Sequence, residues 1–327
     1  MNNITFNELD YLEANPDVAV AVSHGNFLNG FDHWQKFGIK SKRPLCTHAK
    51  LRAKKVFHLL DKSGLGLEIG PSHRPLAPKR AGFNVHILDH ASATELRAKY
   101  QNANVDINNI EEVDFVWRGQ PYSELIGQTH CYDWIISSHV IEHVPDLISH
   151  IKECELLLKP NGFLSLIIPD KRYCFDYFQP LTSTGNWLDA FAERRKKPTP
   201  GQVFDHIANT SKRKGNGAWG NDGLGGADSL GHSFQQAMSI YAKSIETPDY
   251  IDVHCWRFIP ESFKLIIADL KNLGLIDLNV VLHFDTTGTE FYMTLAKTSE
   301  NNIHLNRYSV LNLIRKSCFL ENSSVVV

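Results

Sequence analysis

The sequence has 327 residues, of which 43% are hydrophobic and 21% are charged, and its formal net charge is −2. This composition is typical of a globular protein and excludes a disordered, collagen-like or coiled-coil chain as the main interpretation. The near-neutral charge gives no field that would attract DNA or RNA, so we expect no nucleic-acid partner. The length predicts one large domain with additions, or two domains.

The cysteines and the hydrophobic runs bear on the cellular location. The six cysteines are scattered, and no two have the C-x-x-C spacing of a zinc ribbon or a redox pair. The amino terminus has no basic region followed by an apolar core, and no apolar run approaches the ~20 residues that span a bilayer. We therefore expect a cytoplasmic protein with reduced thiols and no membrane span.

Residues 1–46 have a pattern of their own. Their apolar residues are separated by polar residues, which predicts short helices with turns at Gly25, Gly30 and Gly38. The stretch is too small to form an enzyme core alone, and it resembles a helical module that recurs in bacterial surface-glycan and repeat proteins. The simplest interpretation is an amino-terminal segment that docks on the main domain.

From residue 47 the pattern changes to alternating helices and strands. In chain order we expect a helix (48–60), strands (64–69 and 84–89), a helix (93–100), a weak strand (103–107), a strand (132–137), a helix (146–158), a strand (162–169), a helix (260–273) and two strands (276–282 and 290–296). Nearly continuous apolar strands separated by helices indicate an α/β fold with a parallel sheet covered on both faces. The last strand alternates as a half-buried antiparallel strand does.

The segment from 170 to 250 breaks this pattern. It is rich in polar residues and glycine, and residues 214–226 have no periodicity. Such a stretch inside a compact domain is usually a functional lid or is disordered. We expect residues 214–231 to form a lid or to be poorly ordered without acceptor, and we assign no structure to the tail from 300.

The turn after the first predicted strand is the first candidate site. Glu68 followed by Gly70 is the core of the acidic-x-Gly-x-Gly-x-Gly pattern that binds S-adenosylmethionine, and ligands bind at such strand ends in open parallel sheets. Ser72 and Arg74 stand where the other two glycines would be, and Pro71 stiffens the turn. A simple turn or another kind of nucleotide loop remains an alternative.

The second candidate is Asp89, which ends the next strand. An acidic residue there hydrogen-bonds the ribose hydroxyls of dinucleotide and adenosyl cofactors, because a carboxylate accepts from both at once. No GxGxxG follows the first strand, which favours S-adenosylmethionine over NAD. The alternative is a helix N-cap without a ligand.

A third segment, SSHVIEHVPDL (137–147), carries a specific resemblance. With the strand before it and the helix, Lys-Pro-Asn-Gly turn and strand after it, it is similar to class I S-adenosylmethionine-dependent methyltransferases. The similarity runs over about 65–170 and resumes at 260–297. Five further segments resemble a bacterial branch associated with glycosyltransferases in cell-surface glycan synthesis (68–80, 113–119, 169–181, 201–206 and 252–258).

This resemblance implies a Rossmann-like seven-stranded methyltransferase sheet, a short helical N-terminal module and an inserted lid or acceptor region. The implied domains are 1–46, then 47–299 with its acceptor insertion at 170–259, then a tail at 300–327. Of the residues it implies for the cofactor, Glu68, Gly70 and Pro71 lie at the methionine end, Asp89 at the ribose, His90 beside the adenine, Asp106 and Ile107 at its flanks, and Ser138 and His139 in the loop after the fourth strand.

A hydroxyl acceptor also needs a base, and histidine suits this role because its pKa lies near neutrality. The candidate bases are His254, His143, His206 and Asp170. His254 comes first because Asp252 lies two residues away and would leave an extended backbone on the same face. Aromatic rings interleaved with charged groups suit a sugar. The candidate acceptor-binding residues are Asp170, Arg172, Tyr173, Asp252, Trp256 and Arg257.

Asp205, His206, Asp252 and His254 also raise the question of a metal. Spacing alone does not show that these side chains converge, so we predict no metal site.

The leading hypothesis is a methyltransferase that uses S-adenosylmethionine and acts on a hydroxyl of a sugar, sugar nucleotide or glycan in cell-surface polysaccharide synthesis, with glycosyltransferases as partners. One alternative is a non-catalytic scaffold on a degenerate methyltransferase fold, and the incomplete glycine pattern supports it. The other is an NAD-dependent sugar enzyme, against which the absent GxGxxG speaks.

Overall fold

The computed structural model describes residues 5–220, 225–298 and 306–319. The chain divides into two compact units, Met1–His58 and Leu59–Val327. The helix expected first in the main domain, α4 (His48–Val56), belongs to the first unit by this division. The domain boundaries inferred from the sequence stay predictions.

The first unit consists of short helices, as the sequence predicts. They are α1 (Glu8–Ala14), α2 (Pro16–Ser23), α3 (Gly30–His33), a π-helical turn (Trp34–Gly38) and α4 (His48–Val56). Tyr11 is fully buried, and its hydroxyl lies 2.9 Å from Nδ1 of His33. Gly25 makes a turn at a φ of +77°, whereas Gly30 begins α3 and Gly38 ends the π-helical turn.

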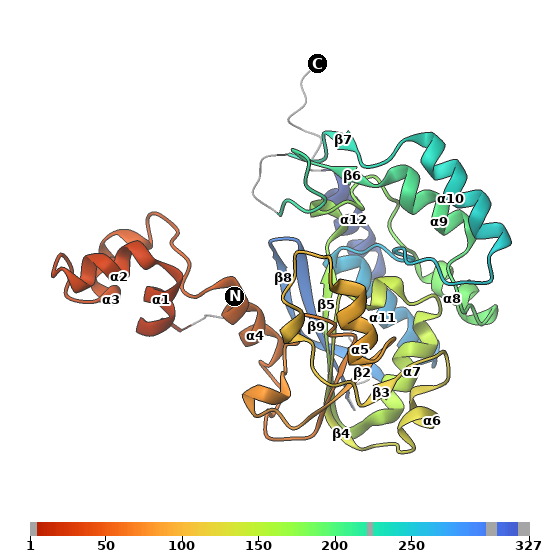
Figure 1. Ribbon diagram of the computed structural model, residues 1–327, viewed down its shortest axis with the longest axis horizontal. Helices are drawn as coiled ribbons and strands as arrows, with labels where there is room; N and C mark the ends of the chain where they lie inside the picture. Colours follow the sequence, from red (N-terminus) through yellow and green to blue (C-terminus); the bar gives the residue numbers. More distant parts are fainter. Residues whose placement is uncertain (1–4, 221–224, 299–305, 320–327) are drawn as a thin grey trace. The chain divides into compact units, whose positions relative to one another are not determined.

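The second unit is built on a seven-stranded sheet within the described residues, in the order β3-β2-β1-β4-β5-β9-β8 (Figure 1). The strands are β1 (Gly66–Ile69), β2 (Val85–Asp89), β3 (Phe115–Val116), β4 (Tyr132–Ser138), β5 (Leu158–Pro169), β8 (Leu278–Thr287) and β9 (Glu290–Lys297). β1 to β5 are parallel, and β9 is antiparallel to both β5 and β8. This is the Rossmann-like α/β fold expected from the sequence. The strand order reverses between β1 and β4, where such sheets bind ligands at their carboxyl edge.

Helices cover this sheet. Those between or after the strands are α5 (Ala93–Tyr100), α6 (Tyr122–Ile126), α7 (Leu147–Leu157) and α11 (Pro260–Asn272). The main core joins the sheet to α7 and α11, and a smaller cluster around Leu96 holds α5. β9 is buried along almost its whole length, not half-buried as its alternation predicts, because it lies between β5 and β8.

The third strand is not where the sequence placed it. No strand forms at 103–107 in the structure; β3 lies at Phe115–Val116 and pairs with Leu88 and Asp89. Residues 107–109 instead form a 3₁₀ turn that the side chain of Asp106 caps by accepting from the amide of Asn108, at 3.0 Å. Asp and Asn side chains compete for backbone groups in this way, which favours turns over strands.

The segment expected to be the acceptor insertion, 170–259, has helices and a short ladder separated by irregular stretches. It contains α8 (Thr184–Ala192), α9 (Pro200–Asn209), α10 (Phe234–Glu246) and a two-stranded ladder of β6 (Ser211–Lys212) and β7 (Ser229–Leu230). α9 and α10 lie side by side (Figure 1). Within the expected lid, residues 221–224 lie outside the described residues, and its mobility stays a prediction. The tail contains α12 (Arg307–Phe319), whose Arg307 pairs with Asp269 of α11.

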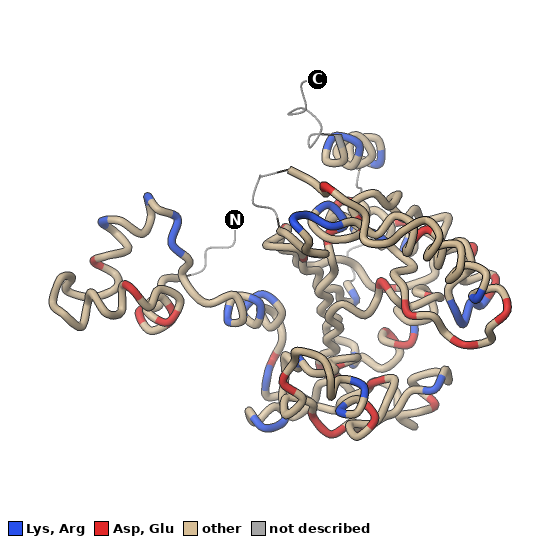
Figure 2. Tube along the Cα trace, turned by 45° about the horizontal axis from the view of Figure 1, so that its top comes forward, with Lys and Arg blue, Asp and Glu red and all other residues tan. Residues whose placement is uncertain are grey.

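Residues of both charge signs, Lys and Arg as well as Asp and Glu, occur along the trace of each unit (Figure 2). This mixture accounts for a net charge near zero. In the part of the chain that the structure describes, no helix combines the length and apolar character that a membrane span requires.

His150 of α7 gives the fold a testable dependence on pH. Burial lowers the pKa of this residue from 6.5 to about 4, so the folded protein keeps the ring neutral while the unfolded chain protonates below pH 6.5. Stability should therefore fall as the pH drops from 6.5 towards 4, by roughly 2 kcal/mol between pH 7 and pH 5. Urea denaturation at both pH values should show this loss in the wild type and a loss smaller by that amount in His150→Gln. Equal losses in the two proteins would contradict the assignment.

Candidate functional site

The turn after β1 begins the carboxyl edge of the sheet. The buried carboxylate of Glu68 accepts from the amides of Leu76 and Ala77, at 2.7 and 3.0 Å. A carboxylate that accepts backbone N–H groups fixes a loop efficiently, because such charge-assisted bonds are stronger than neutral ones. Glu68 therefore shapes the loop of residues 70–77 expected to hold the methionine end of the cofactor.

Gly70 is required in this turn for two reasons. Its φ is +66°, which favours glycine, and a Cβ placed on it would lie 2.7 Å from Cγ2 of Val140. Val140 belongs to the loop after β4. The two loops that flank the point of strand reversal thus approach so closely that there is no room for a side chain at residue 70.

Gly70→Ala should therefore destabilise the protein by more than the ~1–2 kcal/mol that a left-handed backbone costs an L-residue. Gly82→Ala is the matched control, because Gly82 has a φ of +86° and a Cβ placed on it would have no neighbouring atom within 4 Å. Urea denaturation of both variants separates backbone strain from the contact with Val140. If the two variants lose the same stability, or if adding Val140→Ala recovers none of the extra loss, the steric argument fails.

Asp89 lies at the carboxyl end of β2 and is almost fully buried. Its Oδ2 accepts from the amide of Ser72 at 3.1 Å, and its Oδ1 accepts from the amide of His90 at 2.7 Å. Nδ1 of the half-exposed His90 ring lies 2.6 Å from the same oxygen. Asp89 thus joins the turn after β1 to the end of β2, the position expected to bind ribose.

Asp106 and Ile107 end the strand expected at 103–107, the third in the chain, but the structure places them before β3, so they do not follow the third strand and their place at the adenine stays a prediction. The residues that follow β3 are Trp117 and Arg118. The amide of Trp117 donates to the carbonyl of Asp89 at 2.8 Å, and Arg118 donates to the carbonyl of His90 at 2.6 Å. The sequence reasoning missed both, although the alternating apolar residues at 113–117 carry a strand signal.

The loop after β4 brings imidazoles and carboxylates together. Ser138 ends β4, and His139 follows with a φ of +54°, which is uncommon for a residue other than glycine. Nε2 of His139 lies 2.7 Å from Oε2 of Glu290, and Nδ1 lies 3.6 Å from Oε1 of Glu142. Burial lowers the pKa of His139, but the two carboxylates outweigh it and raise that pKa to about 9.

Glu142 is the most buried member of this group, with no exposed surface. Among the described residues, neither oxygen of its carboxylate has a hydrogen-bond partner. Its backbone carbonyl accepts from the amides of Cys255 and Trp256, at 2.7 and 3.2 Å, which fastens the segment before α11 to the loop after β4. Burial raises the pKa of Glu142, but the nearby imidazoles outweigh this effect and lower it.

His143 and His254 both face this carboxylate. Nε2 of each ring lies 4.0 Å from Oε1 of Glu142. Nδ1 of His254 lies 2.5 Å from Oδ2 of Asp176, and Nδ1 of His143 lies 2.8 Å from Oδ1 of Asp252. The acid expected to orient His254 therefore pairs with His143 instead, and Asp176 takes its place at His254. We call His139, Glu142, His143 and His254 the imidazole cluster.

His206 lies beside this cluster but is a poor candidate base. Its Nδ1 accepts from the amide of His254 at 3.1 Å, so the ring proton lies on Nε2 and no nitrogen lone pair is left free. Burial and the nearby charge of His254 lower the pKa of His206 to about 3. Its role as a base stays a prediction that this tautomer does not favour.

Of the expected acceptor-binding residues, Asp170, Trp256 and Arg257 lie in the interior. Asp170 accepts from Nε and Nη2 of Arg172, at 2.9 and 2.6 Å, and this pair braces the loop after β5. Nε1 of Trp256 donates to the carbonyl of Val144 at 2.6 Å, and a ring-stacking contact with an acceptor does not fit its burial. Asp252 is mostly exposed, and Tyr173 is partly exposed beneath the guanidinium of Arg172. The acceptor roles of all six residues stay predictions.

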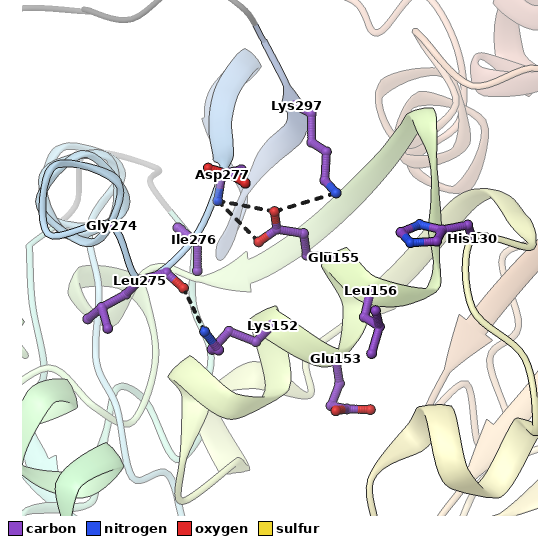
Figure 3. Close-up of a pocket in the computed structure, with 10 residues that line it drawn as sticks. All are labelled: His130, Lys152, Glu153, Glu155, Leu156, Gly274, Leu275, Ile276, Asp277 and Lys297. Atoms are coloured by element: carbon purple, nitrogen blue, oxygen red, sulfur yellow. Dashed lines mark hydrogen bonds and ion pairs between the residues drawn. The ribbon is translucent and has the colours of Figure 1, made fainter.

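A polar pocket of about 370 Å³ lies elsewhere, near the amino ends of β4 and β5 (Figure 3). Its lining includes Lys152, Glu155 and Lys297. Glu155 accepts from the amide of Asp277 and pairs with Lys297 at 3.7 Å, and Lys152 donates to the carbonyl of Leu275 (Figure 3). These charged groups form hydrogen bonds and an ion pair with their neighbours, and they lie at the edge opposite the carboxyl ends of the parallel strands. The pocket is therefore not the candidate site.

A family model described as a methyltransferase domain matches residues 42–213. The chain belongs to this methyltransferase family. Its cofactor is S-adenosylmethionine, and the residues at the carboxyl edge fit that group: Glu68 fixes the loop after β1 through the amides of Leu76 and Ala77, and the carboxylate of Asp89 stands at the end of β2. No curated protein sequence matches the chain.

Solved structures similar to this methyltransferase have low sequence identity. One, described provisionally as a Zn-dependent alcohol dehydrogenase from Rhodobacter sphaeroides, has 9% identity and a TM-score of 0.43 over 76% of this chain and 89% of that chain. A SAM-dependent methyltransferase from Aquifex aeolicus has 10% identity and a TM-score of 0.39 over 77% and 90%. The CcbJ methyltransferase from Streptomyces caelestis has 13% identity and a TM-score of 0.38 over 76% and 95%.

Proposed function

We propose that this methyltransferase transfers a methyl group to a hydroxyl of a sugar, sugar nucleotide or glycan. The observation that carries the proposal is the imidazole cluster at the carboxyl edge of β4, beside the loops that flank the point of strand reversal. A hydroxyl must lose its proton to become a good nucleophile, and a cluster of imidazoles and carboxylates suits that task.

S-adenosylmethionine supplies a methyl group that its sulfonium has already activated. In the reaction that this group would supply, the acceptor oxygen would bond to the methyl carbon, the sulfur would keep the electron pair of the broken carbon–sulfur bond, and the hydroxyl proton would pass to a base of this chain. Alignment of the two reactants contributes most, up to ~7–11 kcal/mol, and the base adds ~10²–10⁴-fold. Glu68, Gly70 and Asp89 hold the cofactor in this proposal, and His143 and His254 are the candidate bases.

The sugar in this proposal comes from the resemblance of several segments to the branch associated with surface-glycan synthesis. The same resemblance supports glycosyltransferases as partners. The exposed carboxylate of Asp252, held at a pKa of about 2 by His143, is available to accept hydrogen bonds from sugar hydroxyls.

The proposal is tested by incubating the full chain with methyl-labelled S-adenosylmethionine and a panel of sugar nucleotides, oligosaccharides, amines and thiols. We expect label in an ether-linked methyl group on a sugar-class acceptor, identified by mass spectrometry. Label only in amines or thiols would overturn the choice of acceptor. Calorimetry that detects no binding of S-adenosylhomocysteine would favour the non-catalytic scaffold.

A further inference from the structure

The buried carboxylate of Glu142 lacks the hydrogen bonds that a buried carboxylate normally accepts. It has no exposed surface, and neither of its oxygens receives a hydrogen bond from the described residues. Burying an ionised carboxylate is costly unless hydrogen bonds, a close ion pair or a metal ion compensate. The nearest imidazole nitrogens lie 3.6 to 4.0 Å away, beyond hydrogen-bond length. The three imidazoles therefore meet the carboxylate only at ion-pair distance, and both of its oxygens keep lone pairs that no hydrogen bond uses.

The two imidazoles that flank this carboxylate are oriented as metal ligands are. Asp176 lies at Nδ1 of His254, and Asp252 lies at Nδ1 of His143. The hydrogen bond between Asp176 and Nδ1 of His254 fixes the proton on that nitrogen, so Nε2 of His254, 4.0 Å from Glu142, keeps its lone pair. Nδ1 of His143 lies 2.8 Å from Asp252 as an ion pair without hydrogen-bond geometry. Metal-binding histidines typically have such a carboxylate behind them, which orients the ring and raises its basicity.

We propose that Glu142, His143 and His254 bind a divalent transition-metal cation of the zinc type. One candidate ligand atom from each residue lies within 4.8 Å of the others. Metal–ligand bonds of about 2.0–2.2 Å place opposing donors up to about 4 Å apart, so modest inward movement of the rings completes the site. Two imidazoles and one carboxylate suit zinc, iron or manganese, whereas magnesium and calcium prefer oxygen ligands.

The sequence did not indicate this site. Its prediction of no metal followed from Asp205, His206, Asp252 and His254, of which only His254 is a ligand in the proposal. The donors come from the turn after β4 and from the segment before α11, which the bonds from Cys255 and Trp256 to the carbonyl of Glu142 hold together. That convergence is tertiary and has no signature in residue spacing.

The site would remain open on one side. The side chain of His143 is 30% exposed, whereas that of His254 is 7% exposed, so solvent and an acceptor approach from the side of His143. A cation with three protein ligands keeps a position for an oxygen and lowers the pKa of a hydroxyl bound there. Binding of the cation does not depend on the reaction, but this role for the acceptor oxygen rests on the proposed function.

The test uses the untagged full chain, stripped with a chelator and titrated with Zn²⁺ by calorimetry. We expect one strong site, weakened at least about 100-fold in Glu142→Gln and in His254→Gln, and ~10–100-fold in Asp176→Asn. His24→Gln is the matched control, because His24 is an exposed histidine of the first unit and should leave the site unchanged. Co²⁺ added in place of Zn²⁺ should give visible absorption bands that Glu142→Gln abolishes.

Absence of a stoichiometric site, or Zn²⁺ affinity unchanged in both ligand variants, would overturn the proposal. Circular dichroism of each variant shows whether it folds, and the Co²⁺ spectrum of the wild type tests the site where a variant does not. S-adenosylhomocysteine is titrated into the same samples. Cofactor binding without Zn²⁺ binding would refute the metal site and leave the proposed function standing. Zn²⁺ binding without cofactor binding would support the metal site and refute the proposed function.

Discussion

Replacing His254 by glutamine is expected to lower the turnover of methyl transfer about 100-fold or more, with the affinity for S-adenosylhomocysteine unchanged. Glutamine keeps much of the size of the ring but neither accepts a proton near neutral pH nor donates a comparable lone pair to a metal. The imidazole lies between Asp176 and Glu142, so its loss removes either a base or a ligand. The measurement is kcat with the best acceptor of the panel, beside calorimetry with S-adenosylhomocysteine.

His130→Gln is the matched control for this variant. His130 lies just before β4, at the opposite edge of the sheet, where its Nδ1 lies 3.1 Å from the carbonyl of Leu158. It should leave turnover unchanged. Near-normal turnover in His254→Gln would transfer the role to His143, and near-normal turnover in His143→Gln as well would exclude both of these imidazoles as the base.

His254 could act as a base or as a metal ligand, and both roles predict the same loss of turnover in His254→Gln. They differ in what else should lower turnover. If the ring is a metal ligand, Glu142→Gln should lower turnover as much as His254→Gln does, and both should lose Zn²⁺ together. If it is a base only, the metal content of the wild type should not correlate with turnover. Assays of chelator-treated protein with and without added Zn²⁺ distinguish the two.

Most strands could be predicted because they are buried on both faces and read as apolar runs. The strand ending at Ile69 and the one ending at Asp89 are of this kind. The position of β3 was predicted wrongly because this strand contributes only two residues to the sheet. The apolar pattern also does not show that Asp106 caps a turn at 107–109, where a strand was expected to end. Short edge strands depend on their neighbour for pairing, which the local sequence does not encode.

The residues expected to bind the cofactor at the carboxyl edge of the sheet could also be predicted from the local sequence. Residues at the ends of successive parallel strands must meet at one edge, so Glu68, Gly70 and Asp89 follow from the strand assignments. The imidazole cluster depends on contacts between distant segments, since Asp176 and His254 lie 78 positions apart. Two-residue spacing made Asp252 the expected partner of His254, but the chain at 252–256 is bound to Glu142 in a way that turns Asp252 towards His143.

Replacing Asp89 by alanine is expected to weaken binding of S-adenosylhomocysteine by ~1–3 kcal/mol, which is about 5- to 150-fold in Kd. The carboxylate is buried at the end of β2 and already accepts from the amides of Ser72 and His90. Its remaining lone pairs are the acceptors that ribose hydroxyls would use, and no other carboxylate ends β2. Calorimetry with S-adenosylhomocysteine measures the loss.

Asp89→Ala also removes bonds that hold the turn after β1, so the ribose role must be separated from loss of structure. Asp89→Asn keeps an oxygen acceptor for one amide and should retain more stability, while still weakening cofactor binding because the charge is gone. Asp114→Asn is the matched control: Asp114 accepts from the amide of Ile87 in β2 at 2.6 Å but precedes β3, away from the carboxyl edge. It should cost stability in urea without changing cofactor affinity. If Asp114→Asn weakened the cofactor as much as Asp89→Asn does, the effect would arise from the sheet as a whole, and Asp89 would lose its assignment to the ribose.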